Sequence, residues 1–118
     1  MSALVAVNAW GDLRDANGAP AFDEGLDFLW AAADAARAEF ENTTIGVIAT
    51  NANLDKARCL LVAQAGHDGL ARAVEPVHAS ADGDAFVAAT VGGVDAPLEV
   101  VRALAARAVE AAIRNAVG

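Results

Sequence analysis

Two threonines next to an asparagine are the residues of this 118-residue chain whose types and order most directly suggest chemistry. Thr43 and Thr44 follow Asn42 and open an apolar, β-branched run. If the chain were cut between Asn42 and Thr43, Thr43 would become an N-terminal residue. Its own α-amino group, with an ordinary pKa of about 7.7–8.0, would then take the proton of its hydroxyl and make it a nucleophile. The commoner alternative is that both hydroxyls only form hydrogen bonds at the entrance of a strand.

A pair of carboxylates stands before a second apolar run. Asp82 and Asp84 are separated by one glycine, and two carboxylates at this spacing can bind a divalent metal or hold a polar catalytic group. An ordinary acidic turn is the alternative, and no further acidic residue or histidine lies at a ligand spacing from them. His67 and His78 have no Cys or His partner at the spacing of a zinc site, so structural roles are favoured for both. The sequence predicts neither a metal nor a cofactor.

Charge and hydropathy exclude several classes of partner. Eight basic residues against sixteen acidic ones give a net charge of −8, and no basic cluster is present. Nucleic-acid binding through phosphate contacts is therefore not expected, nor is binding to an anionic membrane. No run approaches the roughly 20 apolar residues of a membrane span, and the first residues do not resemble a signal peptide, so a cytoplasmic protein is expected. Cys59 lies in an apolar run, which favours a buried, inert thiol.

The elements that would position these residues alternate between strands and helices. Short apolar runs predict strands, and longer amphipathic runs predict helices. The expected order is β-(α)-β-α-β-α, which indicates an α/β layered domain. The predicted strands are 3–8, 44–50 and 85–91, the predicted helices are 54–66 with a further turn at 69–74 and a last helix from about residue 97, and the range 23–40 is either an Ala-rich helix or a linker.

The ends of these elements carry their own signals. Gly92 and Gly93 are expected to stop the strand 85–91, and Gly66 and Gly69 to separate the helix 54–66 from its further turn. Pro97 is expected at the first position of the last helix, because proline is favoured there. Thr43 and the aspartate pair would each stand at the entrance of a strand.

Four blocks of residues, in this order along the chain, resemble the L-aminopeptidase/D-esterase (DmpA-like) family. That family includes β-peptidyl aminopeptidases and the nylon-oligomer hydrolase. The opening segment from Ala3 to Ala9, followed by Gly11 and Asp12, resembles the segment that precedes the family's processing site. The four blocks are Asn42–Ala52, His67–Ala73, Pro76–His78 and Asp82–Asp84.

The resemblance implies a hydrolase of peptides or amides that is made as a precursor and cuts itself once, without a metal or cofactor. The cut would fall between Asn42 and Thr43, with Thr43 as the nucleophile. Asn8 would stabilise the oxyanion, and Asp82 and Asp84 would orient the threonine or its amine. The implied fold is a four-layer αββα sandwich similar to that of N-terminal-nucleophile hydrolases.

The same resemblance implies how the chain is divided. It would be a single domain over 1–118, with a linker over 9–42 before the processing site and a nucleophile-subunit-like segment over 43–118. Family members are longer, and the residues preceding the segment that matches Ala3 supply a tyrosine and a basic residue of the substrate pocket. This chain has no tyrosine, and Lys56 is its single lysine.

Two hypotheses follow. The chain is a self-processing, aminopeptidase-like hydrolase, or it is a truncated, inactive or structural subunit that needs a separate N-terminal region. In the second case the missing strands would leave an apolar sheet surface exposed, which promotes association with that region or with a second copy as a homo-oligomer.

Overall fold

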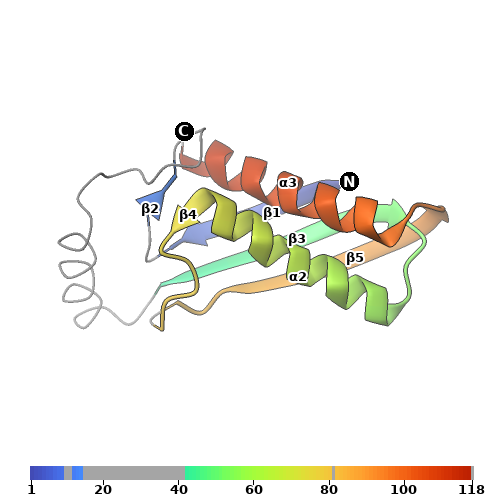
Figure 1. The fold of residues 1–118 in the computed structure, drawn as a ribbon, viewed down its shortest axis with the longest axis horizontal. Helices are drawn as coiled ribbons and strands as arrows, with labels where there is room; N and C mark the ends of the chain where they lie inside the picture. Colours follow the sequence, from blue (N-terminus) through green and yellow to red (C-terminus); the bar gives the residue numbers. More distant parts are fainter. Residues whose placement is uncertain (10–11, 15–41, 81, 118) are drawn as a thin grey trace.

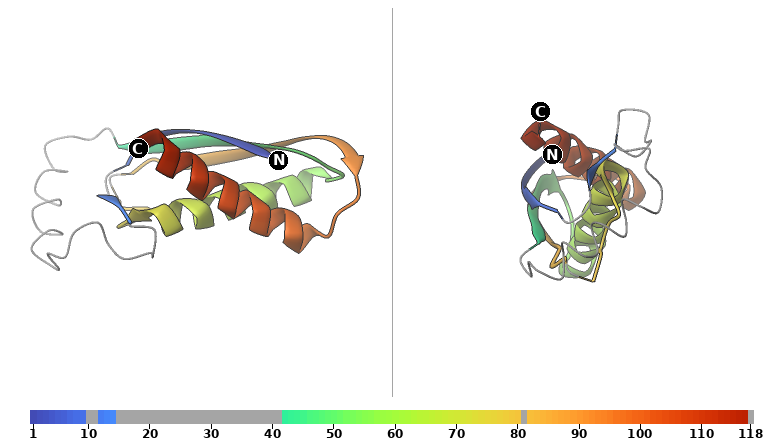
Figure 2. Two further views of the ribbon diagram at one scale, coloured as in Figure 1. Left: turned by 90° about the horizontal axis from the view of Figure 1, so that it is seen from above. Right: turned by 90° about the vertical axis from the view of Figure 1, so that its left-hand side faces the viewer.

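In the described residues, the main unit of the fold is a three-stranded sheet with two helices on one of its faces (Figure 1). The computed structural model describes residues 1–9, 12–14, 42–80 and 82–117. The side view in Figure 2 shows both helices on the same side of the sheet. The elements of this unit are β1 (Ser2–Asn8), β3 (Thr43–Ala52), α2 (Lys56–Ala73), β5 (Ala85–Val94) and α3 (Leu98–Val117).

The strand order is β1-β3-β5, with β1 antiparallel and β5 parallel to the central strand β3. Because β3 and β5 run in parallel, both begin at the same end of the sheet, and β1 ends there. A separate pair of two-residue strands, β2 (Asp12–Leu13) and β4 (Val74–Glu75), lies beyond the end of α2. The expected α/β domain with alternating strands and helices is confirmed.

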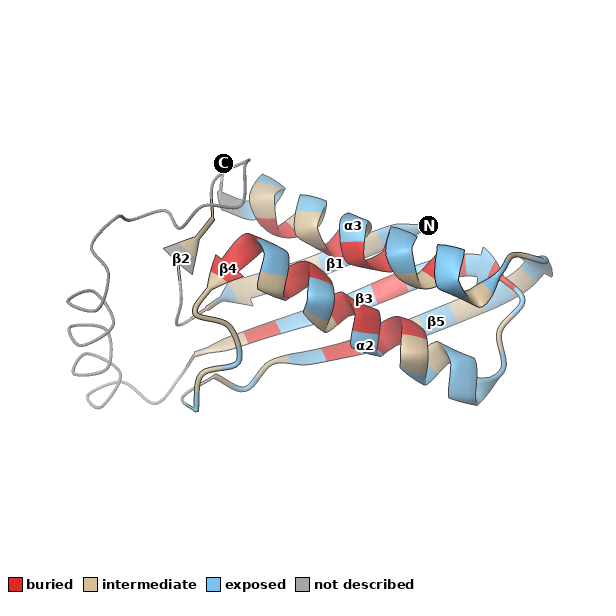
Figure 3. Cartoon of the chain, in the orientation of Figure 1, coloured by how far each residue is buried: buried red, intermediate tan, exposed pale blue. Residues whose placement is uncertain are grey.

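The core lies between the helices and the inner face of the sheet (Figure 3). Along β3, buried and exposed residues alternate, as the period of a strand requires. Ile48 and Phe86 face the helices, and Val62, Val109 and Ile113 pack against them from α2 and α3. The core is therefore mostly aliphatic, as the composition indicates.

The outer face of the sheet is apolar and uncovered by the described residues. The exposed side chains of the three strands on this face include Leu4, Ile45, Val47, Val87 and Val91, of which Leu4 is 78% and Val91 is 90% exposed. The alternation of these strands thus buries one apolar face and leaves a second one open to solvent.

Two glycines predicted to interrupt α2 lie inside it, so the expected break was wrong. The helix runs without interruption to Ala73. A methyl group on Gly66 would come within 2.9 Å of the Phe86 ring, and one on Gly69 would collide with the carbonyl oxygen of Ala106 on α3. Both glycines permit close packing and do not end the helix.

Other predicted boundaries also shift. The strand expected to stop at Gly92 continues as β5 to Val94, with positive φ angles at Gly92 and Gly93 next to a register shift against β3. The last helix begins at Leu98, and Pro97 stands just before it, where its carbonyl accepts from Val101.

Cys59 is partly exposed on α2, so the expectation of a buried thiol was wrong. The possible helix over 23–40 and most of the linker over 9–42 lie outside the described residues. No helix in the described ranges has the length and apolar character of a membrane span.

Candidate active site

Thr43 is the first residue of the central strand β3, at the end of the sheet where β5 also begins. Its side chain is half-buried, and its hydroxyl Oγ1 donates a hydrogen bond of 2.8 Å to the carbonyl oxygen of Asn42. This oxygen belongs to the peptide bond between Asn42 and Thr43, the bond whose cleavage the sequence predicts. The hydroxyl therefore lies directly against the carbonyl group that it would have to attack.

The same carbonyl oxygen has a second donor. The backbone N–H of Gly83 reaches the oxygen of Asn42 at 2.9 Å, and Asn42 forms an isolated parallel bridge with Asp82. A Cβ on Gly83 would lie only 3.2 Å from the Thr43 hydroxyl oxygen. The loop over 82–84 thus passes close to the hydroxyl and polarises the Asn42 carbonyl.

Asp84 anchors the start of β3 from the same loop. The β3–β5 ladder begins with Ile45 opposite Ala85, one residue after the Thr44 amide. Asp84 Oδ1 accepts a hydrogen bond from the Thr44 N–H at 3.0 Å. The carboxylate thus takes the place of a β5 backbone carbonyl, because the paired part of β5 begins only at Ala85. The Asp84 side chain is only 4% exposed.

Asn8 reaches the same end of the sheet from the other side. It is the last residue of β1, it is exposed, and in the antiparallel register it stands opposite Thr43. The structure therefore gathers all five predicted site residues at one end of the sheet, namely Asn8, Asn42, Thr43, Asp82 and Asp84.

His78 joins these residues and His67 packs beside it, and sequence reasoning missed both contacts. His78 Nδ1 lies 2.9 Å from Asp84 Oδ2. The His78 ring packs on His67 with centroids 4.8 Å apart, and His67 meets Phe86 edge-on at 4.9 Å. The position of His78 six residues before Asp84 was the available signal, but both residues lie outside regular helices and strands, so periodicity does not predict their contact.

Burial lowers the pKa of His67 below its usual 6.5, and the neighbouring His78 lowers it further, while Asp84 and Asp68 oppose the shift. His67 is therefore neutral at pH 7. Its Nδ1 is buried without a hydrogen-bond partner among the described residues, and so is the hydroxyl of Thr44, a residue with no exposed surface.

No group of three or more His, Cys, Asp or Glu side chains in the described part of the chain is placed to hold a metal ion. Groups at this end of the sheet instead offer a hydroxyl, a polarised carbonyl and backbone donors, which are the components of acyl transfer.

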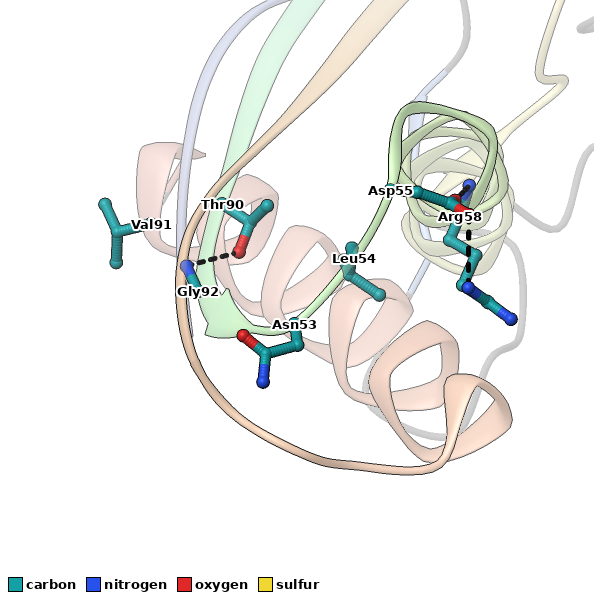
Figure 4. A pocket seen from close by; sticks show the side chains of 7 residues that line it. All are labelled: Asn53, Leu54, Asp55, Arg58, Thr90, Val91 and Gly92. Carbon is teal, nitrogen blue, oxygen red and sulfur yellow. Dashed lines mark hydrogen bonds and ion pairs between the residues drawn. The ribbon is translucent and has the colours of Figure 1, made fainter.

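An open pocket of about 510 Å³ lies at the opposite end of the sheet, where β3 and β5 end (Figure 4). Its polar groups are paired internally. Asn53 accepts from Gly93 and donates to Asp95, and Asp55 caps the first turn of α2 through the Arg58 amide. These hydrogen bonds connect the end of β5 to the turn between β3 and α2, so the polar groups of the pocket have a structural role.

Comparison with known proteins places the chain in a family. The model of peptidase family S58 matches residues 1–118. An uncharacterized aminopeptidase of Mycobacterium leprae is 53% identical over 55 residues, which make up 47% of this chain and 15% of the relative. Uncharacterized aminopeptidases of Mycobacterium bovis and Mycobacterium tuberculosis are each 52% identical over 58 residues, or 49% of this chain and 17% of the relative.

The matched segments are thus a small part of these longer relatives. The family model covers the whole chain, including β1 and the ends of β3 and β5 where the cluster lies. The resemblance found in the sequence is confirmed, and the chain belongs to peptidase family S58.

Proposed function

We propose that this chain is a self-processing peptide or amide hydrolase that uses Thr43 as an N-terminal nucleophile after cleavage between Asn42 and Thr43. The observation that carries the proposal is the pair of donors on the Asn42 carbonyl oxygen, namely the Thr43 hydroxyl at 2.8 Å and the Gly83 N–H at 2.9 Å. Membership of a peptidase family and relatives named aminopeptidases support the reaction class.

Self-processing would begin with attack of Thr43 Oγ1 on the carbonyl carbon of Asn42. The C–O bond forms, the hydroxyl proton passes to the departing nitrogen, and the C–N bond breaks, which leaves an ester and a free amine on Thr43. Negative charge develops on the Asn42 oxygen during attack, where the Gly83 N–H is already placed to stabilise it. Water then hydrolyses the ester, and Asn42 becomes a C-terminal carboxylate.

In the mature enzyme the Thr43 amine would act as the general base. Its ordinary pKa of about 7.7–8.0 suits proton transfer near neutral pH. Thr43 Oγ1 would attack the carbonyl of a peptide or amide substrate, Asn8 would stabilise the oxyanion, and Asp82 and Asp84 would hold the threonine in place. Water would release the acyl group, and no step requires a metal or another cofactor.

The same proposal assigns a role to each segment of the chain and a location in the cell. Residues 9–42 form the linker before the cut, and residues 43–118 form the nucleophile-bearing part, in a cytoplasmic protein. The open apolar face of the sheet supports a four-layer αββα sandwich, because such a face is stable when a second sheet packs on it.

The second candidate function is an inactive or structural subunit. The exposed face containing Leu4, Val87 and Val91 favours it. In that case a second sheet, from a separate N-terminal region or from another copy of the chain, would have to cover this face before any activity develops.

Mass spectrometry of the full chain after expression tests the processing. Fragments covering 1–42 and 43–118 are expected from the wild type. Thr43→Ala removes the nucleophile and should leave the chain intact, whereas Thr43→Ser keeps a hydroxyl and should still be cut.

Thr44→Val is the matched control. It removes the adjacent hydroxyl, which has no partner among the described residues, and keeps the size of the side chain and the backbone N–H. Cleavage should persist in this variant. A Thr43→Ala chain that is still cut at the same bond, or a Thr44→Val chain that is folded and uncut, would contradict Thr43 as the nucleophile.

A further inference from the structure

The peptide group that follows Thr43 is held by a side chain in place of the sheet. The Thr44 N–H lies one residue before the first β3–β5 pair, so Asp84 Oδ1 accepts it at 3.0 Å. Processing would break the covalent link on the other side of Thr43. The Thr44–Asp84 hydrogen bond is then one of the few contacts that fix the backbone of the nucleophile, together with its pairing to Asn8.

Asp84 can hold this position only if its second oxygen is also satisfied. A carboxylate that is 4% exposed pays a large desolvation cost unless its oxygens accept hydrogen bonds. His78 Nδ1 lies 2.9 Å from Asp84 Oδ2 and must donate there, since an ionised carboxylate only accepts. Without His78, Oδ2 would lose this partner, and rotation toward water would carry Oδ1 away from Thr44.

His78 is itself held in an unusual conformation. Its φ of 53° lies in the left-handed region, which residues other than glycine enter at an energetic cost that the surrounding structure must offset. Its ring lies against His67 of α2, which in turn packs on Phe86. Burial lowers the pKa of His67 and keeps it neutral at pH 7, so this packing places an uncharged ring against His78. Backbone and ring contacts together aim Nδ1 at Asp84.

We propose that His78 is a positioning residue, which holds the Thr43–Thr44 peptide, and with it the Thr43 hydroxyl, through the carboxylate of Asp84. The groups that face His78 are Asp84 from the loop before β5 and His67 from α2, with Asp68 beside His67. The consequence of this inference for catalysis rests on the proposed function. The hydrogen bonds from His78 through Asp84 to Thr44 are themselves a property of the fold.

Three substitutions of His78 distinguish the effect of its hydrogen bond from the effect of its backbone conformation, and one substitution of His67 tests the ring packing. His78→Asn places an amide nitrogen near the position of Nδ1 and tolerates the left-handed backbone. His78→Gly tolerates the same backbone but has no donor, and His78→Leu has neither the donor nor the backbone preference. His67→Phe keeps an aromatic ring against His78 and serves as the packing control.

The first measurement follows the Thr44 amide by NMR in the full chain that also carries Thr43→Ala, so that every sample is uncut. The amide should exchange with solvent more slowly in the His78 chain and in His78→Asn than in His78→Gly and His78→Leu. Equal exchange in all four would overturn the inference, whether or not the wild-type chain cuts itself.

The second measurement is the rate of cleavage in chains that keep Thr43. His78→Gly and His78→Leu should be cut about 10- to 100-fold more slowly, the usual loss when a group that orients a reacting residue is removed. His78→Asn should restore most of the rate, and His67→Phe should stay near wild type. Equal rates for His78→Asn and His78→Gly would overturn the inference while leaving self-processing intact. A wild-type chain that is never cut would contradict the proposed function instead, and the amide measurement would still decide the role of His78.

Discussion

At the scale of single residues, Thr43 and Thr44 show how position on a strand separates two chemically equal side chains. Thr43 is half-buried, and its hydroxyl contacts the Asn42 carbonyl, whereas Thr44 faces the core with no exposed surface. Successive residues of a strand point to opposite faces. The Thr43 hydroxyl is therefore the partly exposed one of the two, and Thr44 contributes its backbone N–H to Asp84.

Acid should destabilise the protein through His67. Its pKa in the folded chain lies below the usual 6.5, so the unfolded chain binds more protons as the pH falls through this value. The free energy of unfolding should therefore decrease from pH 7.5 to pH 5.5. Urea unfolding followed by circular dichroism measures this loss.

His67→Phe is the matched variant for this prediction, because it keeps a ring against Phe86 and cannot take up a proton. Its stability should vary less with pH over the same window. A wild-type chain and a His67→Phe chain with the same pH dependence would show that protonation of His67 carries no cost.

At the scale of elements, the packing of α2 on α3 depends on one glycine. Gly69 brings the helices so close that a methyl group would collide with the carbonyl oxygen of Ala106. The site residues themselves stand at the ends of β1, β3 and β5, and α2 carries His67 to the same end of the sheet. Separation of the two helices would therefore disturb the side of the site that His67 supports.

Gly69→Ala should lower the free energy of unfolding by about 1–3 kcal/mol, the typical cost of overpacking a tight contact. This loss should exceed the gain of up to about 1 kcal/mol from the better helix propensity of alanine. Gln64→Ala, at an exposed position of the same helix, is the control and should change stability little. If Gly69→Ala unfolds at a higher urea concentration than the wild type, the helices separate without cost.

Sequence patterns predicted these elements well but placed their ends poorly. Continuous apolar runs located β1, β3 and β5, and amphipathic periodicity located the helices, although such runs indicate strands buried on both faces and β3 buries one. The glycines at 66 and 69 were wrongly expected to break α2, and Gly92 to stop β5. A glycine that permits close packing and one that ends an element are the same letter in the sequence, and only the neighbouring element distinguishes them.

At the scale of the whole molecule, the described residues cover one face of the sheet and leave the other face open. Both helices lie on the same side (Figure 2). On the other side, apolar side chains of all three strands are exposed among the described residues. Large exposed apolar patches promote association. Net charge of −8 opposes it only weakly at physiological ionic strength, where charges are screened over about 8 Å.

The chain by itself should therefore associate through this face. Sedimentation or size-exclusion chromatography over a range of concentrations should detect species larger than one chain. Val87→Glu places a charge on the β5 strand of the open face and should shift the chain toward the monomer. Leu60→Glu, at an exposed position of α2, should leave the distribution unchanged. A wild-type chain that is monomeric at every concentration would contradict the need for a covering sheet.

The sequence by itself determined the family, the alternation of strands and helices, and the residues Asn8, Asn42, Thr43, Asp82 and Asp84 as the candidate site. The elements follow from local order along the chain, and the family and the site residues follow from the resemblance that the four blocks of residues carry. The tertiary structure decided that all five lie at one end of the sheet, and that His78 joins them through Asp84. The reason is that parallel pairing of β3 and β5 brings together residues about 40 positions apart, and local periodicity contains no information on contacts at that separation.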